Sequence, residues 1–169
     1  MQKEYPTRDT SLIGAAGVHH VVSELSLRGL IALPTIRNTA GVDVLVTNKS
    51  GIWHANLQVK SSRSRVNFWP VGAKYAEWVG PNNSYVFLRF DPKMGKFEVF
   101  LESSKNVARL VARGRLEEKH RGAKEWAPCF YPKGQYDRLR ENWRLFGREV
   151  LIQPVPGAAM VKGSHGTTT

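Results

Sequence analysis

The chain has 169 residues, of which 41% are hydrophobic, and this excludes wholesale disorder and suits one domain of ordinary size. Its 25 Lys and Arg residues outnumber its 14 Asp and Glu residues, which gives a net charge of +11 at pH 7. A field of this sign attracts polyanions, and nucleic acid is the commonest large one. The charge therefore favours a nucleic-acid partner, with a solvated basic surface as the alternative.

The cysteine content and the apolar runs predict where the protein resides. A single cysteine, Cys129, cannot form an internal disulfide and gives no sign of an oxidising compartment. Residues 1–6 contain no apolar run, and no stretch approaches the roughly 18 apolar residues that a membrane span needs. We therefore expect a soluble, cytoplasmic protein with no membrane partner.

The first predicted element is a helix over residues 9–29. Asp9 is a good N-cap residue, and Gly29 is well placed to end the helix. Its apolar residues repeat at helical spacing and form one face, which consists of Val18, Val21, Val22 and Leu25. A short strand candidate follows at residues 31–36.

The next predicted element is a β-hairpin. Residues 42–47 and 52–60 are strand-like, and the turn residues 48–51 connect them. The later predicted elements are a second hairpin, a helix, an exposed polar segment with some helix, and a last helix, at residues 84–101, 107–111, 113–125 and 136–146. We expect one domain over residues 1–153 and a disordered tail over residues 154–169, where Pro, Gly, Ser and Thr dominate.

The first hairpin determines where its polar residues go. Side chains alternate along a strand, so Gln58 and Lys60 share one face while their apolar neighbours point to the other. Folding the chain at the turn brings Asp43 near residues 56–58, and a small register shift or a bulge puts it beside Gln58. A carboxylate, a carboxamide and an amine then converge among buried apolar residues, where polar groups need a reason.

These residues carry a resemblance to a known superfamily. Gly41-Val42-Asp43, then a turn and Leu57-Gln58-Val59-Lys60, resembles the PD-(D/E)XK signature of the restriction-endonuclease-like nucleases. Residues 17–30 resemble the first helix of that superfamily. The pattern is similar to archaeal Holliday-junction resolvases and to small endonuclease-like proteins whose hairpin ends in Gln-Val-Lys. The resemblance implies an α/β fold with a restriction-endonuclease-like core, in which helices flank a mixed β-sheet.

The resemblance also implies a role for each residue of the motif. Asp43 would bind a divalent metal ion, Mg²⁺ or Mn²⁺, with Gln58 as a second oxygen ligand and the backbone carbonyl of Val59 as a third. Lys60 would orient or help deprotonate the attacking water and stabilise the charge that develops on the phosphate. Hard oxygen ligands hold Mg²⁺, and hydrolysis of a DNA phosphodiester needs such a positive centre.

The sequence departs from the superfamily pattern at three positions. Val42 replaces the usual Pro, and the neutral Gln58 replaces the usual acid. Val18 stands where the superfamily often has a metal-associated Glu, and Glu24 is the nearest substitute. Glu24 lies at the edge of the apolar helix face, where it points either to the site or to water. If it points to water, Asp43 is the only carboxylate of the site.

Each candidate also has an ordinary structural explanation. Asp43 can serve as a turn or capping residue, Lys60 as an exposed lysine, and Gln58 as a hydrogen-bonded sheet residue. Arg63 and Arg65 follow the motif directly, and their natural role is phosphate contact in nucleic-acid binding.

Several functions remain open at this point. The first is a metal-dependent endonuclease that hydrolyses DNA, and the second is a catalytically impaired nucleic-acid-binding module of the same fold. The third is a basic α/β protein that binds RNA or a protein partner. Trp69 and Trp78 are candidates for stacking on bases, or else they belong to the core. Many nucleases of this class act as dimers, so a homodimer is considered as well.

Overall fold

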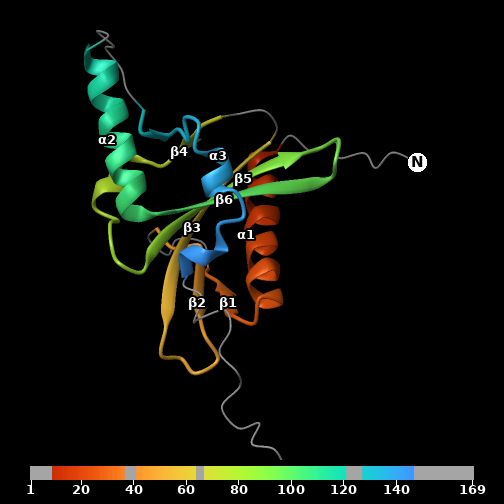
Figure 1. Cartoon of the computed structure of the whole chain (residues 1–169). Helices are drawn as coiled ribbons and strands as arrows, with labels where there is room; N and C mark the ends of the chain where they lie inside the picture. The colour runs from red at the N-terminus through yellow and green to blue at the C-terminus, as the bar shows by residue number, and fades with distance from the viewer. Residues whose placement is uncertain (1–8, 37–40, 64–66, 121–126, 147–169) are drawn as a thin grey trace, which may run out of the picture.

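A five-stranded sheet in the order β1-β2-β3-β5-β6 forms the centre of the computed structural model, which describes residues 9–36, 41–63, 67–120 and 127–146 (Figure 1). The strands are β1 (Ile31–Pro34), β2 (Val44–Thr47), β3 (His54–Arg63), β5 (Asn83–Asp91) and β6 (Lys96–Ser103). Strands β3 and β5 are parallel, whereas the other neighbouring pairs are antiparallel. The sheet is therefore mixed, as predicted.

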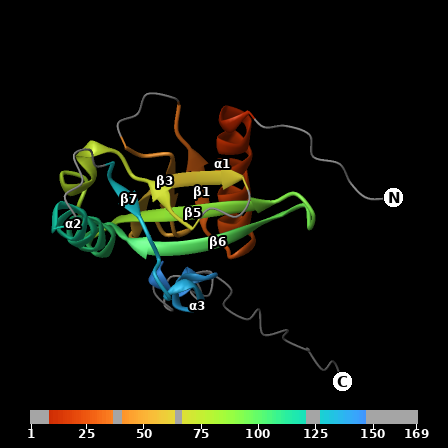
Figure 2. The same ribbon diagram turned by 90° about the horizontal axis from the view of Figure 1, so that it is seen from above.

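The other elements surround this sheet. They are α1 (Thr10–Leu27), η1 (Ala73–Ala76), α2 (Ser104–His120), α3 (Tyr136–Leu139), η2 (Trp143–Phe146) and a small second sheet of β4 (Trp69–Pro70) and β7 (Cys129–Phe130). Figures 1 and 2 show α1 and α2 at opposite sides of the molecule, with the strands between them. Among the described helices, none combines the length and the apolar character that crossing a membrane requires.

Helix α1 begins and ends close to the predicted positions. The Asp9 carboxylate accepts a hydrogen bond from the Ser11 N–H at 2.8 Å, which caps the first turn. Gly29 follows the helix with a φ of +82°, a conformation that glycine adopts without strain. The face that packs on the sheet is rotated slightly from the predicted one and buries Ile13, Gly17, Val21 and Leu25.

Strand β5 shows that both faces of the sheet are covered. Val86 and Leu88 pack with Val21 and Leu25 of α1 in one core cluster. The alternate residues Tyr85 and Phe87 pack in a second cluster with Val107 and Val111 of α2. A strand that is buried on both faces carries a nearly continuous apolar run, which explains the composition of β5.

Helix α2 corrects the predicted polar segment at 113–125. The helix continues to His120, because residues 113–120 are rich in the strong helix formers Arg, Leu, Glu and Lys. An ion pair one turn apart, Arg113 with Glu117 at 3.1 Å, supports its exposed end. Residues 121–126 lie outside the described ranges.

The predicted single helix over 136–146 is also corrected. The helix ends at Leu139, Arg140 is extended, and Glu141 has a φ of +48°. Leu139 packs in the cluster of α2, whereas Trp143 and Phe146 pack in the cluster of α1. The break therefore lets one short segment close both faces of the sheet. The predicted boundary between residues 153 and 154, and the tail beyond it, lie outside the described residues.

Candidate functional site

Asp43 lies immediately before β2, where the two hairpin strands begin to pair. Its N–H donates to the Leu57 carbonyl at 2.8 Å, and its Oδ2 accepts from the Val59 N–H at 2.7 Å. The last described pair of the β2–β3 register is Val44 with Leu57, and Asp43 precedes that pair. Its two hydrogen bonds therefore reach β3 just beyond the regular pairing, at the residues on either side of Gln58.

Gln58 and Lys60 project from β3 on the face away from α1. Their neighbours Leu57 and Val59 belong to the core cluster of α1, and side chains alternate along the strand. Burial lowers the pKa of Lys60 below its ordinary value, and the nearby Asp43 carboxylate opposes that shift. The structure thus places the Asp43 carboxylate near the Lys60 amine, and Gln58 lines the same cleft as Lys60.

A cleft of about 570 Å³ lies beside two of these residues, Gln58 and Lys60. Tyr85 also lines it from the sheet, and Gly41, Lys74 and Trp78 line it from the segments outside the sheet. A Cβ at Gly41 would lie 2.9 Å from two ring atoms of Trp78, and Gly41 has a φ of +74°. The loop that leads into Asp43 therefore needs glycine where it passes the indole ring.

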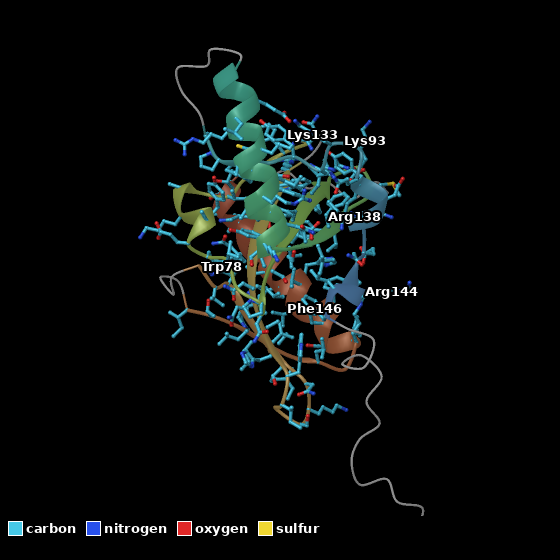
Figure 3. All side chains as sticks on the ribbon, turned by 60° about the vertical axis from the view of Figure 1, so that its left-hand side comes forward. Trp78, Lys93, Lys133, Arg138, Arg144 and Phe146 are labelled. Atoms are coloured by element: carbon cyan, nitrogen blue, oxygen red, sulfur yellow. The ribbon has the colours of Figure 1, made fainter. Side chains whose placement is uncertain are left out.

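Hydrogen bonds fix the segment that carries Trp78. The Asn83 side chain donates to the Trp78 carbonyl at 2.9 Å. The Ser104 hydroxyl, at the start of α2, accepts from the Gly80 N–H and donates to the Gly80 carbonyl, each at 3.1 Å. Figure 3 shows Trp78 near the base of α2 and apart from Phe146, which belongs to the cluster of α1. The cleft wall is thus tied to the ends of β5 and α2.

Glu24 is not brought to this site. Its carboxylate forms an ion pair with Arg28, one turn further along α1, at 2.5 Å. The Arg28 guanidinium lies 4.4 Å from the ring centroid of Trp143, which packs in the core cluster of α1. Glu24 is therefore on the α1 side of the sheet, whereas Gln58 and Lys60 face the cleft on the other side.

The two predicted phosphate-contacting arginines differ in what the structure describes. Arg63 is the last residue of β3, about 10 Å along the strand from Lys60. Strand alternation puts its side chain on the face opposite that of Lys60, at the end of the sheet. Arg65 lies outside the described ranges. The role of both residues stays a prediction.

The site offers three oxygen donors to a cation. The Oδ2 of Asp43 accepts from the Val59 N–H, and its other carboxylate oxygen, Oδ1, is the one offered to a cation. The Val59 carbonyl points to the same edge of β3 as its N–H, where the described pairing with β2 stops at Val44. The Gln58 amide is the third donor. Within the described ranges, no three His, Cys, Asp or Glu side chains gather to hold a metal ion. Magnesium is often bound by one or two carboxylates plus substrate phosphates, so this donor set fits it when DNA completes the site.

Sequence reasoning did not assign Tyr85 and Glu77 to the site. Both line the cleft, Tyr85 from β5 and Glu77 from the segment after η1. Strand β5 reaches the site only through its parallel pairing with β3, in which Tyr85 stands beside Gln58. Such a pairing joins residues 27 positions apart, and no local pattern in the sequence announces it.

The described fold is an α/β fold with a five-stranded mixed sheet flanked by helices, similar to an endonuclease fold. Among solved structures, it is similar to that of a bacterial homing endonuclease, I-Ssp6803I, with a TM-score of 0.52. The sequence identity is 12%, and the match covers 85% of this chain and 95% of that chain. No protein-family model and no curated protein matches the sequence. The likeness shows the fold alone, so membership of the PD-(D/E)XK superfamily stays a prediction.

The burial of Lys60 has a consequence for stability. Because its pKa is lower in the folded chain than the ordinary 10.5, the unfolded chain binds more protons between those two values. The free energy of unfolding therefore rises as the pH rises from the folded-state pKa of Lys60 to 10.5. Below the folded-state pKa, Lys60 is charged in both states, and the folded chain carries the full destabilisation from burying that charge. We expect Lys60→Met to raise the urea midpoint near pH 7, with a gain that shrinks towards pH 10. Lys49→Met, at an exposed turn, is the control, and an equal gain at both pH values would contradict the expectation.

Proposed function

We propose that this chain is a metal-dependent endonuclease of the PD-(D/E)XK type that hydrolyses DNA phosphodiester bonds. The observation that carries the proposal is that Gln58 and Lys60 line one cleft, while the Asp43 carboxylate is bonded to the Val59 N–H between them and lies close enough to Lys60 to affect its pKa. The similarity of the fold to that of a homing endonuclease supports a nuclease, and the net charge of +11 supports a polyanionic substrate.

Each residue has a defined part in the proposed reaction. Asp43, Gln58 and the Val59 carbonyl would hold Mg²⁺ or Mn²⁺, which when bound neutralises phosphate oxygens and acidifies water. Lys60 would donate a hydrogen bond to the phosphate and stabilise the negative charge that develops on it. Its partial burial strengthens that interaction, because charges attract more strongly where water is excluded.

A second candidate is a nucleic-acid-binding module of the same fold with impaired catalysis. The observation that favours it is the short supply of negative charge. Glu24 is paired with Arg28 on the other side of the sheet, so it adds nothing to Asp43. A weakly charged site binds Mg²⁺ poorly until a phosphate arrives. A homodimer, common among nucleases of this class, is a further proposal that sedimentation would measure.

Metal dependence separates the two candidates. Supercoiled plasmid and a branched DNA are incubated with the chain in Mg²⁺, Mn²⁺, Ca²⁺ or EDTA, and binding is measured beside cleavage. The endonuclease proposal expects cleavage in Mg²⁺ or Mn²⁺ and none in EDTA. Binding without cleavage in every metal supports the impaired module. Absence of binding even at low salt contradicts both.

The salt dependence of binding tests the proposed phosphate contact of Arg63. Each phosphate contact contributes about 0.9 to the slope of log affinity against log salt concentration. We expect Arg63→Gln to reduce that slope by about 1, with an equal effect on unrelated DNA sequences. Lys49→Gln, at the exposed turn before β3, is the matched control. An unchanged slope for Arg63→Gln would assign Arg63 a purely structural role.

A further inference from the structure

Tyr85 lines the cleft, and its hydroxyl is buried without a hydrogen-bond partner among the described residues. The residue is only 1% exposed, and the sheet register places it beside Gln58. Nearly all buried polar groups in proteins are paired, so an exception calls for an explanation. The position next to the candidate site suggests that the missing partner arrives with a ligand.

Aromatic rings hold this hydroxyl in place. The Tyr85 ring stacks on Phe87 with 5.5 Å between centroids and an angle of 2°. Trp78 meets it edge-on, with 4.9 Å between centroids and an angle of 72°. Tyr75 lines the same cleft from η1. A ligand that enters would therefore meet rigid aromatic surfaces in addition to the polar residues of β3.

The size and charge of the cleft indicate the kind of ligand. A phosphate group fills only a small part of about 570 Å³, and the aromatic walls offer it nothing. Two ammonium groups, of Lys60 and the exposed Lys74, outnumber the one carboxylate, of Glu77, in the cleft lining, and they suit a phosphate. Trp78 and Tyr75 suit the face of a planar ring. A nucleotide combines both chemistries.

We propose that the cleft accommodates an unpaired nucleotide of the DNA next to the cleaved phosphate, with its base against Trp78 and Tyr75 and a hydrogen bond from the Tyr85 hydroxyl. This inference rests on the proposed nuclease function and names its substrate class as DNA with an unpaired or displaced nucleotide. A paired base must lose its pairing and stacking before it can enter a concave pocket, whereas an unpaired base enters at a lower cost.

Burial also keeps the hydroxyl ready to donate. It raises the pKa of Tyr85 to about 12, so the phenol stays protonated throughout the neutral range. The base would therefore present an acceptor to it, which all four DNA bases carry. The pocket is expected to favour an unpaired nucleotide without strong preference for its sequence.

The test compares two DNA duplexes that differ only in one 2-aminopurine, which is either paired or placed in a single-nucleotide bulge. Binding is measured in Ca²⁺ by fluorescence, which also reports whether the base leaves the stack. Tyr85→Phe removes the hydroxyl alone, and we expect it to weaken binding of the bulged duplex roughly 3- to 10-fold, as for one lost hydrogen bond. Binding of the paired duplex is expected to stay unchanged.

Two further variants complete the design. Tyr136→Phe is the matched control, because it removes a hydroxyl that donates to the Asn67 carbonyl at 3.2 Å elsewhere in the same core cluster. It is expected to leave both affinities unchanged. Trp78→Ala is expected to weaken binding of the bulged duplex about 10-fold or more through lost stacking, with thermal unfolding as a check on its fold.

The outcomes separate this inference from the proposed function. Equal binding of the two duplexes by the unaltered chain, or an unaltered preference in Tyr85→Phe, overturns the nucleotide pocket. If the chain shows either of these results but still cleaves fully paired DNA in a metal-dependent way, the endonuclease proposal remains supported. Failure to bind either duplex at low salt overturns both.

Discussion

Asp43→Asn is expected to lower the rate of DNA cleavage roughly 10²- to 10³-fold while leaving the fold intact. The asparagine keeps an oxygen that accepts from the Val59 N–H, so the hydrogen bond that ties β2 to β3 survives. The variant loses the negative charge that the proposed cation needs. Plasmid cleavage measures the rate, and urea unfolding measures the stability.

The chain offers a matched control for this substitution. Asp91 accepts from the Lys93 N–H at 2.8 Å in the β5–β6 turn, so Asp91→Asn makes the same chemical change to a similar backbone contact outside the cleft. Its cleavage rate is expected to equal that of the unaltered chain. Full cleavage by Asp43→Asn would end the proposed metal role of Asp43.

Asp43→Ala separates the structural role of the carboxylate from its proposed chemistry. Alanine leaves the Val59 N–H without a partner next to a buried strand, which costs about 1–3 kcal/mol. This variant is therefore expected to lose both stability and cleavage, whereas Asp43→Asn loses cleavage alone. Similar urea midpoints for the two variants would show that the hydrogen bond contributes little.

The parts of the fold that local patterns determine were predictable from the sequence. Turn-forming residues at 48–51 and a strand-like run on each side predicted the first hairpin, and the structure has it with strands at Val44–Thr47 and His54–Arg63. The hairpin brings Asp43 to β3, where its carboxylate accepts from the Val59 N–H. The resemblance to the PD-(D/E)XK signature extended this to a mixed sheet flanked by helices, which the structure confirms.

The parts that depend on distant pairing or on competing contacts were not predictable. From its position at the edge of the apolar helix face, the Glu24 side chain could point to the site or to water. Arg28, one turn further along the helix, is the partner with which it forms an ion pair. Tyr85 enters the site through a parallel pairing, which no turn between the strands specifies. The sequence left two roles open for Trp78, stacking on bases or packing in the core. In the structure its ring packs edge-on against the buried Tyr85 and also lies next to Gly41 of the cleft.

Gly17→Ala is expected to destabilise the fold by about 2 kcal/mol and to disturb the site. A Cβ at this position would lie 2.0 Å from the Ser61 hydroxyl oxygen and 2.8 Å from a methyl group of Leu88. The Ser61 and Leu88 side chains would have to rotate, or helix α1 would have to shift away from the sheet strands that carry them. Ser61 follows Lys60 directly, so the shift would move the proposed catalytic lysine. Thermal unfolding and plasmid cleavage measure the two effects.

The same helix contains the control. Gly14 has nothing within 4 Å of an added Cβ, so Gly14→Ala is expected to stabilise α1 by about 0.5–1 kcal/mol through the better helix propensity of alanine. Ser61→Ala removes a hydroxyl that is buried and has no partner within the described part of the chain, and the stability of this variant is expected to equal or exceed that of the unaltered chain. The double variant Gly17→Ala with Ser61→Ala lacks the 2.0 Å contact with the Ser61 hydroxyl but keeps the contact with Leu88. It should therefore regain part of the stability that Gly17→Ala alone loses. Equal stability of Gly17→Ala and Gly14→Ala would show that α1 and β3 are not packed as closely as the structure has them.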